Sequence, residues 1–109
     1  MANTFKVLGQ SLPTPNTFTT LYTVPAATSA IISTLNVCNQ SLANVTFRAA
    51  IRPAGETITA KHYLVFDTPI PGQDSIALSL GMTMGNTDVL TVFSFQGNVS
   101  FNVFGTEIT

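Results

Sequence analysis

The residues best suited to acid–base chemistry are five carboxylates, Glu56, Asp67, Asp74, Asp88 and Glu107. General acid–base catalysis needs two such groups whose surroundings push their pKa values apart. Asp74 and Asp88 adjoin glycine-containing turns, where aspartate commonly accepts hydrogen bonds from nearby backbone. Asp67 lies in the middle of a predicted strand, so we expect it to face outward or to form a salt bridge. The carboxylates therefore indicate no catalytic pair.

His62 and Cys38 are the single histidine and the single cysteine of the chain. One chain cannot form a pair of histidine metal ligands, although a threefold axis could bring three copies of His62 together. We expect a solvated or capping role for His62 at the start of a strand. Cys38 is predicted to be a small packed strand residue. A lone cysteine excludes an internal disulfide and leaves an intermolecular disulfide or a reactive thiol open.

Sequence motifs for phosphate binding, nucleophilic catalysis and paired metal-binding cysteines do not occur in the chain. We therefore expect a protein that is not an enzyme. The sequence predicts no catalytic residue, no cofactor and no metal site.

The chain carries very little charge. Charged residues make up 8% of its 109 residues, against about 25% in an ordinary soluble domain. Because a lone globule normally stays soluble through charges of both signs, we expect copies of the chain or a partner to cover much of its surface. The net charge of -1 and four cations argue against nucleic acid or an anionic membrane as partner.

Two of these cations, Arg48 and Arg52, stand on the polar side of one predicted strand. They are either solvated or paired with Asp67 or Glu56 of another subunit.

The mean hydropathy of +0.36 is high, but no run of about 18 apolar residues is present to cross a membrane. The first six residues lack the charged-then-apolar order of a signal peptide, so we expect synthesis in a cytoplasm.

Short runs of β-branched and aromatic residues, separated by turn residues at intervals of about 8 to 12, favour an antiparallel β-fold. The predicted strands are residues 17–24, 30–39, 43–52, 62–70, 75–80, 88–95 and 99–104. Residues 4–9 are a further strand or part of an extended N-terminal arm over residues 1–16. Residues 56–61 are a loop or an irregular edge strand, and residues 81–86 are a loop. We predict one all-β domain over residues 1–109, an antiparallel β-sandwich of seven to eight strands, Ig-like or jelly-roll-like.

The alternation of apolar and polar residues assigns side chains to the two faces of each strand. The predicted aromatic-rich inner layer is Phe93, Phe95, Phe101 and Val103. The remaining predicted core residues are Ile31, Leu35, Val37, Val45, Phe47, Ala49, Ile51, Ile76, Leu78 and Leu80. Three strands are apolar on both faces, at residues 31–32, 89–93 and 103–104. A monomer does not require this and a subunit interface does, so we expect a homo-oligomer, most simply a trimer.

Several segments together resemble a family of small virion proteins of tailed bacteriophages, frequent in phages of aquatic bacteria including cyanobacteria. They are LYTVPA at 21–26, TSAIIS at 28–33, VCN at 37–39, TFR at 46–48, IRPAG at 51–55, KHY at 61–63, TDV at 87–89 and SFNVFGTEI at 100–108. The likeness extends over nearly the whole chain from residue 17 onward. These motifs are strand and turn patterns, so the resemblance implies a particle component and no active site.

The expected function is therefore that of a non-enzymatic virion structural protein, made in the host cytoplasm and located in the virion. Its expected partners are copies of itself and other virion proteins, bound through apolar β faces. The resemblance leaves open the tail, in a fibre or baseplate, and the capsid, as a decoration (cement) protein. The alternative is a host-receptor or carbohydrate-binding module in which His62, Tyr63 and Asn86 contact a glycan. The absence of tryptophan and the two tyrosines weaken that alternative.

Overall fold

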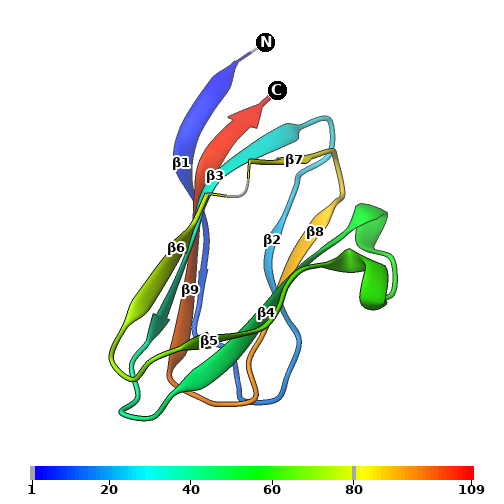
Figure 1. Ribbon diagram of the computed structural model, residues 1–109. Coiled ribbons are helices and arrows are strands. Elements are labelled where there is room, and N and C mark those ends of the chain that lie inside the picture. The colour runs from blue at the N-terminus through cyan, green and yellow to red at the C-terminus, as the bar shows by residue number, and fades with distance from the viewer. Residues whose placement is uncertain (1, 80) are drawn as a thin grey trace.

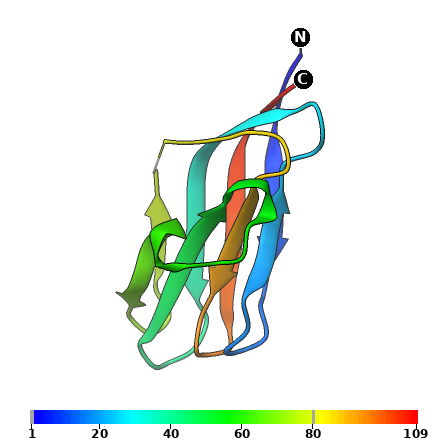
Figure 2. The same ribbon diagram turned by 90° about the vertical axis from the view of Figure 1, so that its right-hand side faces the viewer.

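The computed structural model describes residues 2–79 and 81–109, which form two antiparallel sheets facing each other across a shared hydrophobic core (Figure 1). The strands are β1 (Asn3–Ser11), β2 (Thr19–Thr23), β3 (Ser29–Asn39), β4 (Val45–Arg52), β5 (Tyr63–Ile70), β6 (Ser75–Leu78), β7 (Met82–Met84), β8 (Val89–Phe93) and β9 (Val99–Ile108). One sheet has the order β1-β9-β3-β6, with β7 also paired to β3, and the other has the order β2-β8-β4-β5 (Figure 2). The prediction of an all-β antiparallel fold is confirmed.

Three segments differ from, or decide between, the sequence-based expectations. Residues 4–9 belong to β1, which pairs with β9 from Asn3 to Ser11. Residues 81–86, predicted to be a loop, contain the short strand β7, which pairs with β3 and adds one strand to the predicted set. Residues 56–61 form no strand, and the segment between β4 and β5 contains two short 3-10 helices, η1 (Pro53–Gly55) and η2 (Ala60–His62).

Two phenylalanines from opposite sheets meet at the centre of the core. Phe47 of β4 and Phe101 of β9 are both fully buried, and their rings lie edge to face with centroids 6.1 Å apart. The predicted core residues Leu35, Val37, Val45, Phe47, Ala49, Phe101 and Val103 are confirmed as buried, and Ile51, Ile76 and Leu78 pack partly buried against them. Leu80 lies outside the described residues.

A β-bulge in β3 overturns the core assignment of Ile31. Its side chain is 44% exposed, whereas that of Ile32 is fully buried. The pairing of β3 with β9 shifts between Ile32 and Thr34, and one extra residue at a bulge exchanges the inner and outer faces of the strand. Leu35 and Val37 therefore share the inner face with Ile32, although their positions differ in parity.

The inner-layer assignment of Phe93 and Phe95 was also wrong. The inner positions of β8 are Leu90 and Val92, both fully buried members of the core. Phe93 lies outside the core cluster, and Phe95, beyond the end of β8, is 47% exposed. Because β8 is apolar at every position but Thr91, its alternation does not reveal which face is the inner one.

The segment between β4 and β5 covers part of the outer face of the four-stranded sheet. Figure 2 shows residues 53–62, in green, in front of that sheet. Val89 is 7% exposed, and its side chain lies beside Gly55. Asp88 anchors the segment, because its Oδ1 accepts a hydrogen bond from the Ala54 N–H at 3.0 Å. Part of the apolar surface that suggested a subunit interface is therefore covered within the chain.

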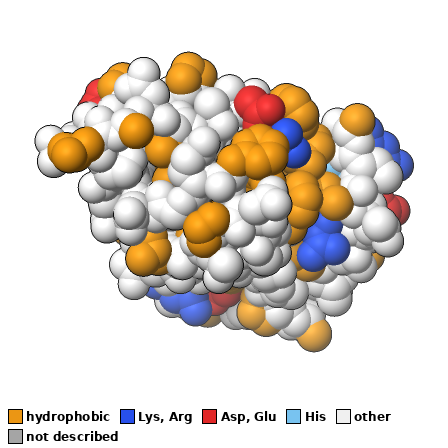
Figure 3. All heavy atoms as spheres, turned by 90° about the horizontal axis from the view of Figure 1, so that it is seen from below, with side chains coloured by type: hydrophobic (Ala, Val, Ile, Leu, Met, Phe, Trp, Pro, Cys, Tyr) orange, Lys and Arg blue, Asp and Glu red, His pale blue; other side chains and the backbone are white. Residues whose placement is uncertain are grey.

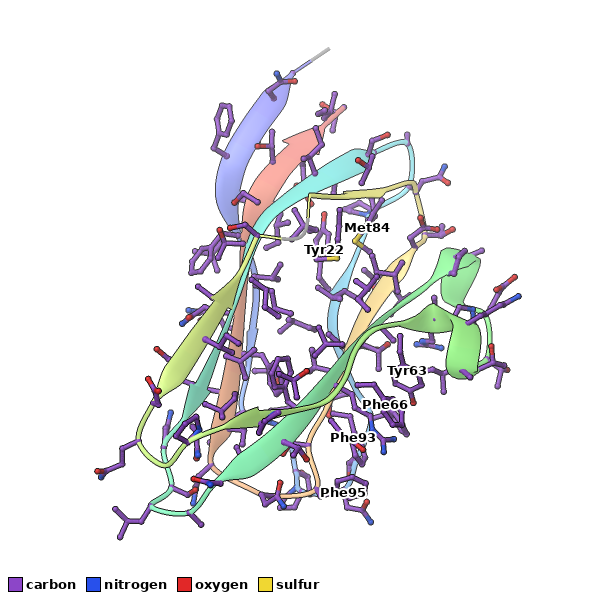
Figure 4. The ribbon with its side chains drawn as sticks, in the orientation of Figure 1. Tyr22, Tyr63, Phe66, Met84, Phe93 and Phe95 are labelled. Carbon is purple, nitrogen blue, oxygen red and sulfur yellow. The ribbon has the colours of Figure 1, made fainter. Side chains whose placement is uncertain are left out.

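A buried tyrosine connects the two sheets near the chain termini. The Tyr22 hydroxyl of β2 donates to Glu107 Oε2 of β9 at 2.5 Å, and Lys6 Nζ of β1 lies 2.8 Å from Glu107 Oε1. Tyr22 points into the space between the sheets (Figure 4). Burial and the Glu107 carboxylate raise the pKa of Tyr22, while hydrogen bonds from Lys6 and Tyr22 lower the pKa of Glu107.

Two matched substitutions test these face assignments. Phe101→Ala should lower the free energy of unfolding by about 3–5 kcal/mol, because it removes a fully buried ring and leaves a cavity. Phe95→Ala, on the exposed side, should lower it by less than about 1 kcal/mol. Urea unfolding of both variants, at a dilution where the chain is monomeric, measures the difference. A larger loss for Phe95→Ala than for Phe101→Ala would contradict the assignment.

Candidate functional site

Aromatic rings surround Arg48 on the outer face of the four-stranded sheet. The Arg48 Cζ atom lies 4.1 Å from the ring centroid of Phe66, 5.0 Å from those of Phe93 and Phe95, and 5.8 Å from that of Tyr63. All four distances are within the range of cation–π attraction. Figure 4 shows the four rings grouped on the side of this sheet that faces away from the core.

The positions of Arg48 and Asp67 follow from the local backbone. In β4, Arg48 lies between the inward-facing Phe47 and Ala49, so its side chain points outward. Asp67 has a left-handed backbone (φ 50°), and the register of β5 against β4 shifts between Phe47 and Ala49. A bulge of this kind re-aims a side chain, and aspartate tolerates the left-handed conformation better than most residues.

Arg48 and Asp67 form a two-pronged ion pair. Arg48 Nε donates to Asp67 Oδ1 at 2.7 Å and Nη2 donates to Oδ2 at 3.1 Å. The Arg48 side chain is 16% exposed and that of Asp67 is 35% exposed. The hydrogen bonds from Arg48 lower the pKa of the Asp67 carboxyl, so it stays ionised and neutralises the guanidinium.

The rings around this pair also contact one another. Phe93 stacks on Phe18 with ring centroids 4.5 Å apart, and Phe95 meets Phe93 edge to face at 4.8 Å. Tyr63 and Phe66 meet edge to face at 5.0 Å. Phe93 is only 4% exposed as a result, whereas Phe18, Phe66 and Phe95 remain 43%, 57% and 47% exposed. We call these three exposed rings the aromatic face.

Space-filling shows hydrophobic side chains beside single acidic and basic groups toward the upper right of the view from below (Figure 3). Such a surface has little capacity for acid–base chemistry, because its one carboxylate and its one cation neutralise each other. Aromatic rings and arginine are instead the side chains enriched where proteins bind one another. The chemistry available to the aromatic face is apolar contact.

The other carboxylates are engaged separately within the chain. Both oxygens of Asp88 accept backbone hydrogen bonds, from Ala54 and Gly85, and Asp74 accepts one from the Ser75 N–H. Both turn aspartates therefore bind nearby backbone, as predicted, and the salt-bridge alternative for Asp67 is confirmed. Among the described residues, no three His, Cys, Asp or Glu side chains gather as a metal site would require.

His62 is a buried cap and not a solvated residue. Its Nδ1 accepts a hydrogen bond from the Thr59 N–H at 3.0 Å, and its Nε2 lies 3.2 Å from Glu56 Oε1. The capping alternative is thus confirmed. Because the imidazole is 4% exposed, three copies of it cannot meet on a threefold axis without local rearrangement. Cys38 is a half-buried free thiol in β3.

The residues of the predicted glycan site lie in separate surroundings. Tyr63 contacts the rings near Arg48, while His62 is buried against Thr59 and Glu56. Asn86 lines an open hollow together with residues 27–29 and 108–109. Only Tyr63 therefore belongs to the candidate site.

The arginine contacts differ from the expectation of pairing across subunits. Arg48 meets Asp67 of its own chain. Arg52 reaches the Glu56 backbone carbonyl at 3.0 Å, and its Nε donates to Thr91 Oγ1 at 3.0 Å. The position of Asp67 in the middle of a strand was recognisable from the sequence, whereas the cluster of rings around its partner Arg48 was not. One feature of the sequence could have indicated the cluster: Arg48 and Asp67 have opposite charges, lie on two predicted strands, and each follows a phenylalanine in the chain.

Within the described residues, no helix has the length and apolar character needed to span a membrane. No family model, curated protein or solved structure matches this chain. The geometry of the chain itself therefore carries the functional argument.

The Arg48–Asp67 pair predicts a pH-dependent stability. Because the pKa of Asp67 is lowered in the folded protein, its contribution is present above the ordinary aspartate pKa and is lost as pH falls below about 4. The difference in unfolding free energy between wild type and Asp67→Asn should be largest near neutral pH and shrink on acidification. Urea titrations across this pH range measure it.

An Arg48→Met background supplies the control for this titration. Without the guanidinium, Asp67→Asn should show far less pH dependence, since the cause of the lowered pKa is gone. The same pH dependence in both backgrounds would show that Arg48 is not the cause.

Proposed function

We propose that this chain is a non-enzymatic structural protein of a tailed-phage virion, which assembles with copies of itself through apolar β surfaces. The observation that carries the proposal is the aromatic face, where Phe18, Phe66 and Phe95 remain about half exposed around a neutralised ion pair. Solvent-facing rings of this size are favourable to bury. The low charge of the chain, 8% of its residues, supports burial of this surface in an assembly.

The strand order supports a jelly-roll sandwich over an Ig-like one. When β7 is set aside, the remaining eight strands, numbered in chain order, read 1-8-3-6 in one sheet and 2-7-4-5 in the other. That alternation between sheets is the jelly-roll order, common in viral capsid proteins. An Ig-like sandwich would place its first two strands side by side in one sheet, whereas β1 and β2 lie in different sheets. This support is an analogy of fold and does not identify a function by itself.

The engagement of the cations supports partners other than nucleic acid or a lipid surface. Lys6 pairs with Glu107, and Arg48 pairs with Asp67. Arg52 donates to backbone carbonyls and to Thr91. Phosphate binding requires a concentrated set of free cations, and three of the four cations of this chain are used internally.

Two places in the particle are open. The protein belongs either to the tail, in a fibre or baseplate, or to the capsid, as a decoration (cement) protein. The sequence resemblance supports a particle component without separating these places. The partners in either place are copies of the chain, for which a trimer is the expected number, and other virion proteins. Immunogold labelling of intact particles of the encoding phage distinguishes tail from capsid, and an absence of label on both would contradict the proposal.

A second candidate function is binding of a host carbohydrate. The exposed rings of Phe66 and Phe95 beside the partly exposed Asp67 carboxylate favour it, because a sugar can stack on a ring while a carboxylate accepts its hydroxyl hydrogen bonds. Retention of wild type on immobilised host surface polysaccharide, and loss of retention for Phe66→Ser, would favour this function over self-assembly.

Self-assembly through the aromatic face predicts a contact that is nearly insensitive to salt. Sedimentation should give a mass above the 11.6 kDa of one chain, with little change between about 50 mM and about 1 M NaCl, because screening acts on charges and not on apolar burial. Phe66→Ser should lower the assembled mass. Arg52→Ala, which removes a cation that bonds to Thr91 and to the Gly55 and Glu56 carbonyls, should leave it unchanged.

Leu42→Ser is the matched control for the loss of an exposed apolar side chain, since Leu42 is 83% exposed in the β3–β4 turn. It should assemble as wild type does. Dissociation by salt alone, or a wild-type monomer that binds no virion protein, would contradict the proposal.

A further inference from the structure

The N-terminal part of β1 presents a free strand edge. Among the described residues β1 pairs only with β9, at one end of its sheet (Figure 2). Farther along, the backbone of β2 lies close to β1, because a Cβ at Gly9 would lie 2.2 Å from the Leu21 carbonyl oxygen. The free edge therefore comprises residues 3–7, the part of β1 before its register shifts at Val7.

We propose that residues 3–7 pair, antiparallel and about a two-fold axis, with the same residues of a second copy of this chain. The inference rests on the self-assembly proposed above and adds the strand edge through which two copies join. It does not depend on which place in the virion the protein occupies.

The hydrogen-bond phase of β1 supports this pairing. Ala2 and Thr109 exchange both backbone hydrogen bonds, each at 3.0 Å. In an antiparallel ladder, every second residue directs its N–H and C=O toward the same neighbour. Thr4 and Lys6 therefore direct these groups toward β9, whereas Asn3, Phe5 and Val7 direct theirs toward the free edge. An antiparallel copy of the same segment presents the matching donors and acceptors.

The other sheet edges are less suited to pairing. The outer strand β5 carries Pro69, which has no N–H, and the left-handed Asp67, and its register against β4 shifts twice. β6 and β7 have four and three residues, and β2 has five residues with a register shift. Proline, bulges, short length and charged side chains disfavour edge-to-edge pairing. Residues 3–7 contain no proline and belong to a nine-residue strand whose register shifts only after Val7. Their one charged side chain, Lys6, pairs with Glu107 of the same chain.

The side chains along the free edge favour contact with a second copy. Phe5 is 79% exposed and Val7 is 48% exposed. The register places Val7 beside Phe104, and places Phe5 in one row with Thr106 and Ile31. Phe104 and Ile31 are themselves 36% and 44% exposed. A paired copy would extend these apolar rows across the two-fold axis.

Hydrogen bonding and charge together select the register of the pair. An axis through Lys6 would set two lysines directly opposite each other, which is destabilising. An axis through Phe5 sets Phe5 against Phe5 of the second copy and Lys6 against its Thr4. The axis at Phe5 pairs Asn3 with Val7 and Phe5 with its own copy, so all three edge-facing residues are used. The axis at Lys6 would place Asn3 opposite Gly9, where β2 lies close. Hydrogen bonding and the repulsion between lysines both favour the axis at Phe5.

The symmetry of this contact fixes what its loss would do. A two-fold contact joins assemblies in pairs. Alone it produces a dimer, and together with a threefold contact through the aromatic face, with the two axes perpendicular and intersecting, it produces a hexamer. In both cases, removal of the β1 contact halves the mass of the assembly.

The mass of Phe5→Lys, measured by sedimentation beside wild type, tests the proposal. We expect half the wild-type mass, because two lysines then oppose each other at the axis. Leu42→Lys, which adds the same charge at a comparably exposed site, should keep the full mass. An equimolar mixture of Phe5→Lys and Phe5→Glu should restore the full mass, since opposite charges then meet at the axis.

A disulfide measurement keeps the proposal falsifiable if these variants fold poorly. Phe5→Cys in a Cys38→Ser background should form a disulfide-linked dimer on mild oxidation, because opposed residues of a hydrogen-bonded pair have Cα atoms about 5.5 Å apart, within disulfide range. Leu42→Cys in the same background should not form one.

The outcomes separate this inference from the proposed function. A wild-type assembly of odd copy number, or one whose mass Phe5→Lys leaves unchanged, overturns the β1 contact while self-assembly stands. If the strand that pairs with β1 belongs to another virion protein, the purified chain shows neither the halving nor the Phe5→Cys dimer, which also overturns it. A wild-type monomer that binds no virion protein overturns both proposals.

Discussion

Each sheet of this molecule carries apolar side chains on both faces, and the opposite sheet can cover only one of them. The apolar side chains of the two inner faces are buried against each other around Phe47 and Phe101, which are fully buried. On the outer face of the four-stranded sheet, the chain covers Val89 with η1 and covers Phe93 with neighbouring rings. Phe66 remains more than half exposed, so the favourable burial of apolar area is incomplete in the single chain.

Arg48 shows how a charge can stay inside such an apolar surface. Removing a guanidinium from water is unfavourable unless a counter-ion and hydrogen bonds replace the lost hydration. Asp67 supplies both, at 2.7 and 3.1 Å, and the ring faces of Phe66 and Phe93 supply further electrostatic attraction. The bulge that orients Asp67 is thus tied to the rings, because without the carboxylate the arginine would be an unpaired charge among them.

The success of sequence-based prediction depended on whether alternation was unambiguous and uninterrupted. In β4, Val45, Phe47 and Ala49 alternate with polar residues, and all three are buried as predicted. In β3 the bulge after Ile32 exchanges the inward-facing and outward-facing positions of the strand. No local sequence pattern predicted this bulge. The candidate site requires Arg48 opposite Phe93, a pairing set by long-range register. Asp67 was recognisable as unusual because it interrupts an apolar strand, but its neighbours in space were not.

A chain with so few charges also has little means of rejecting wrong partners. Like-charge repulsion is one usual way to disfavour a competing contact, and here Lys6, Arg48 and Arg52 are engaged within the chain. Discrimination must then come mainly from geometry. Pro69 and the bulges of β5 disfavour one sheet edge. Residues 3–7 of β1, in contrast, pair with β9 alone among the described residues, so their outer backbone groups can accept a partner strand. Those groups point outward at every second residue, which restricts a partner strand to the registers that match them.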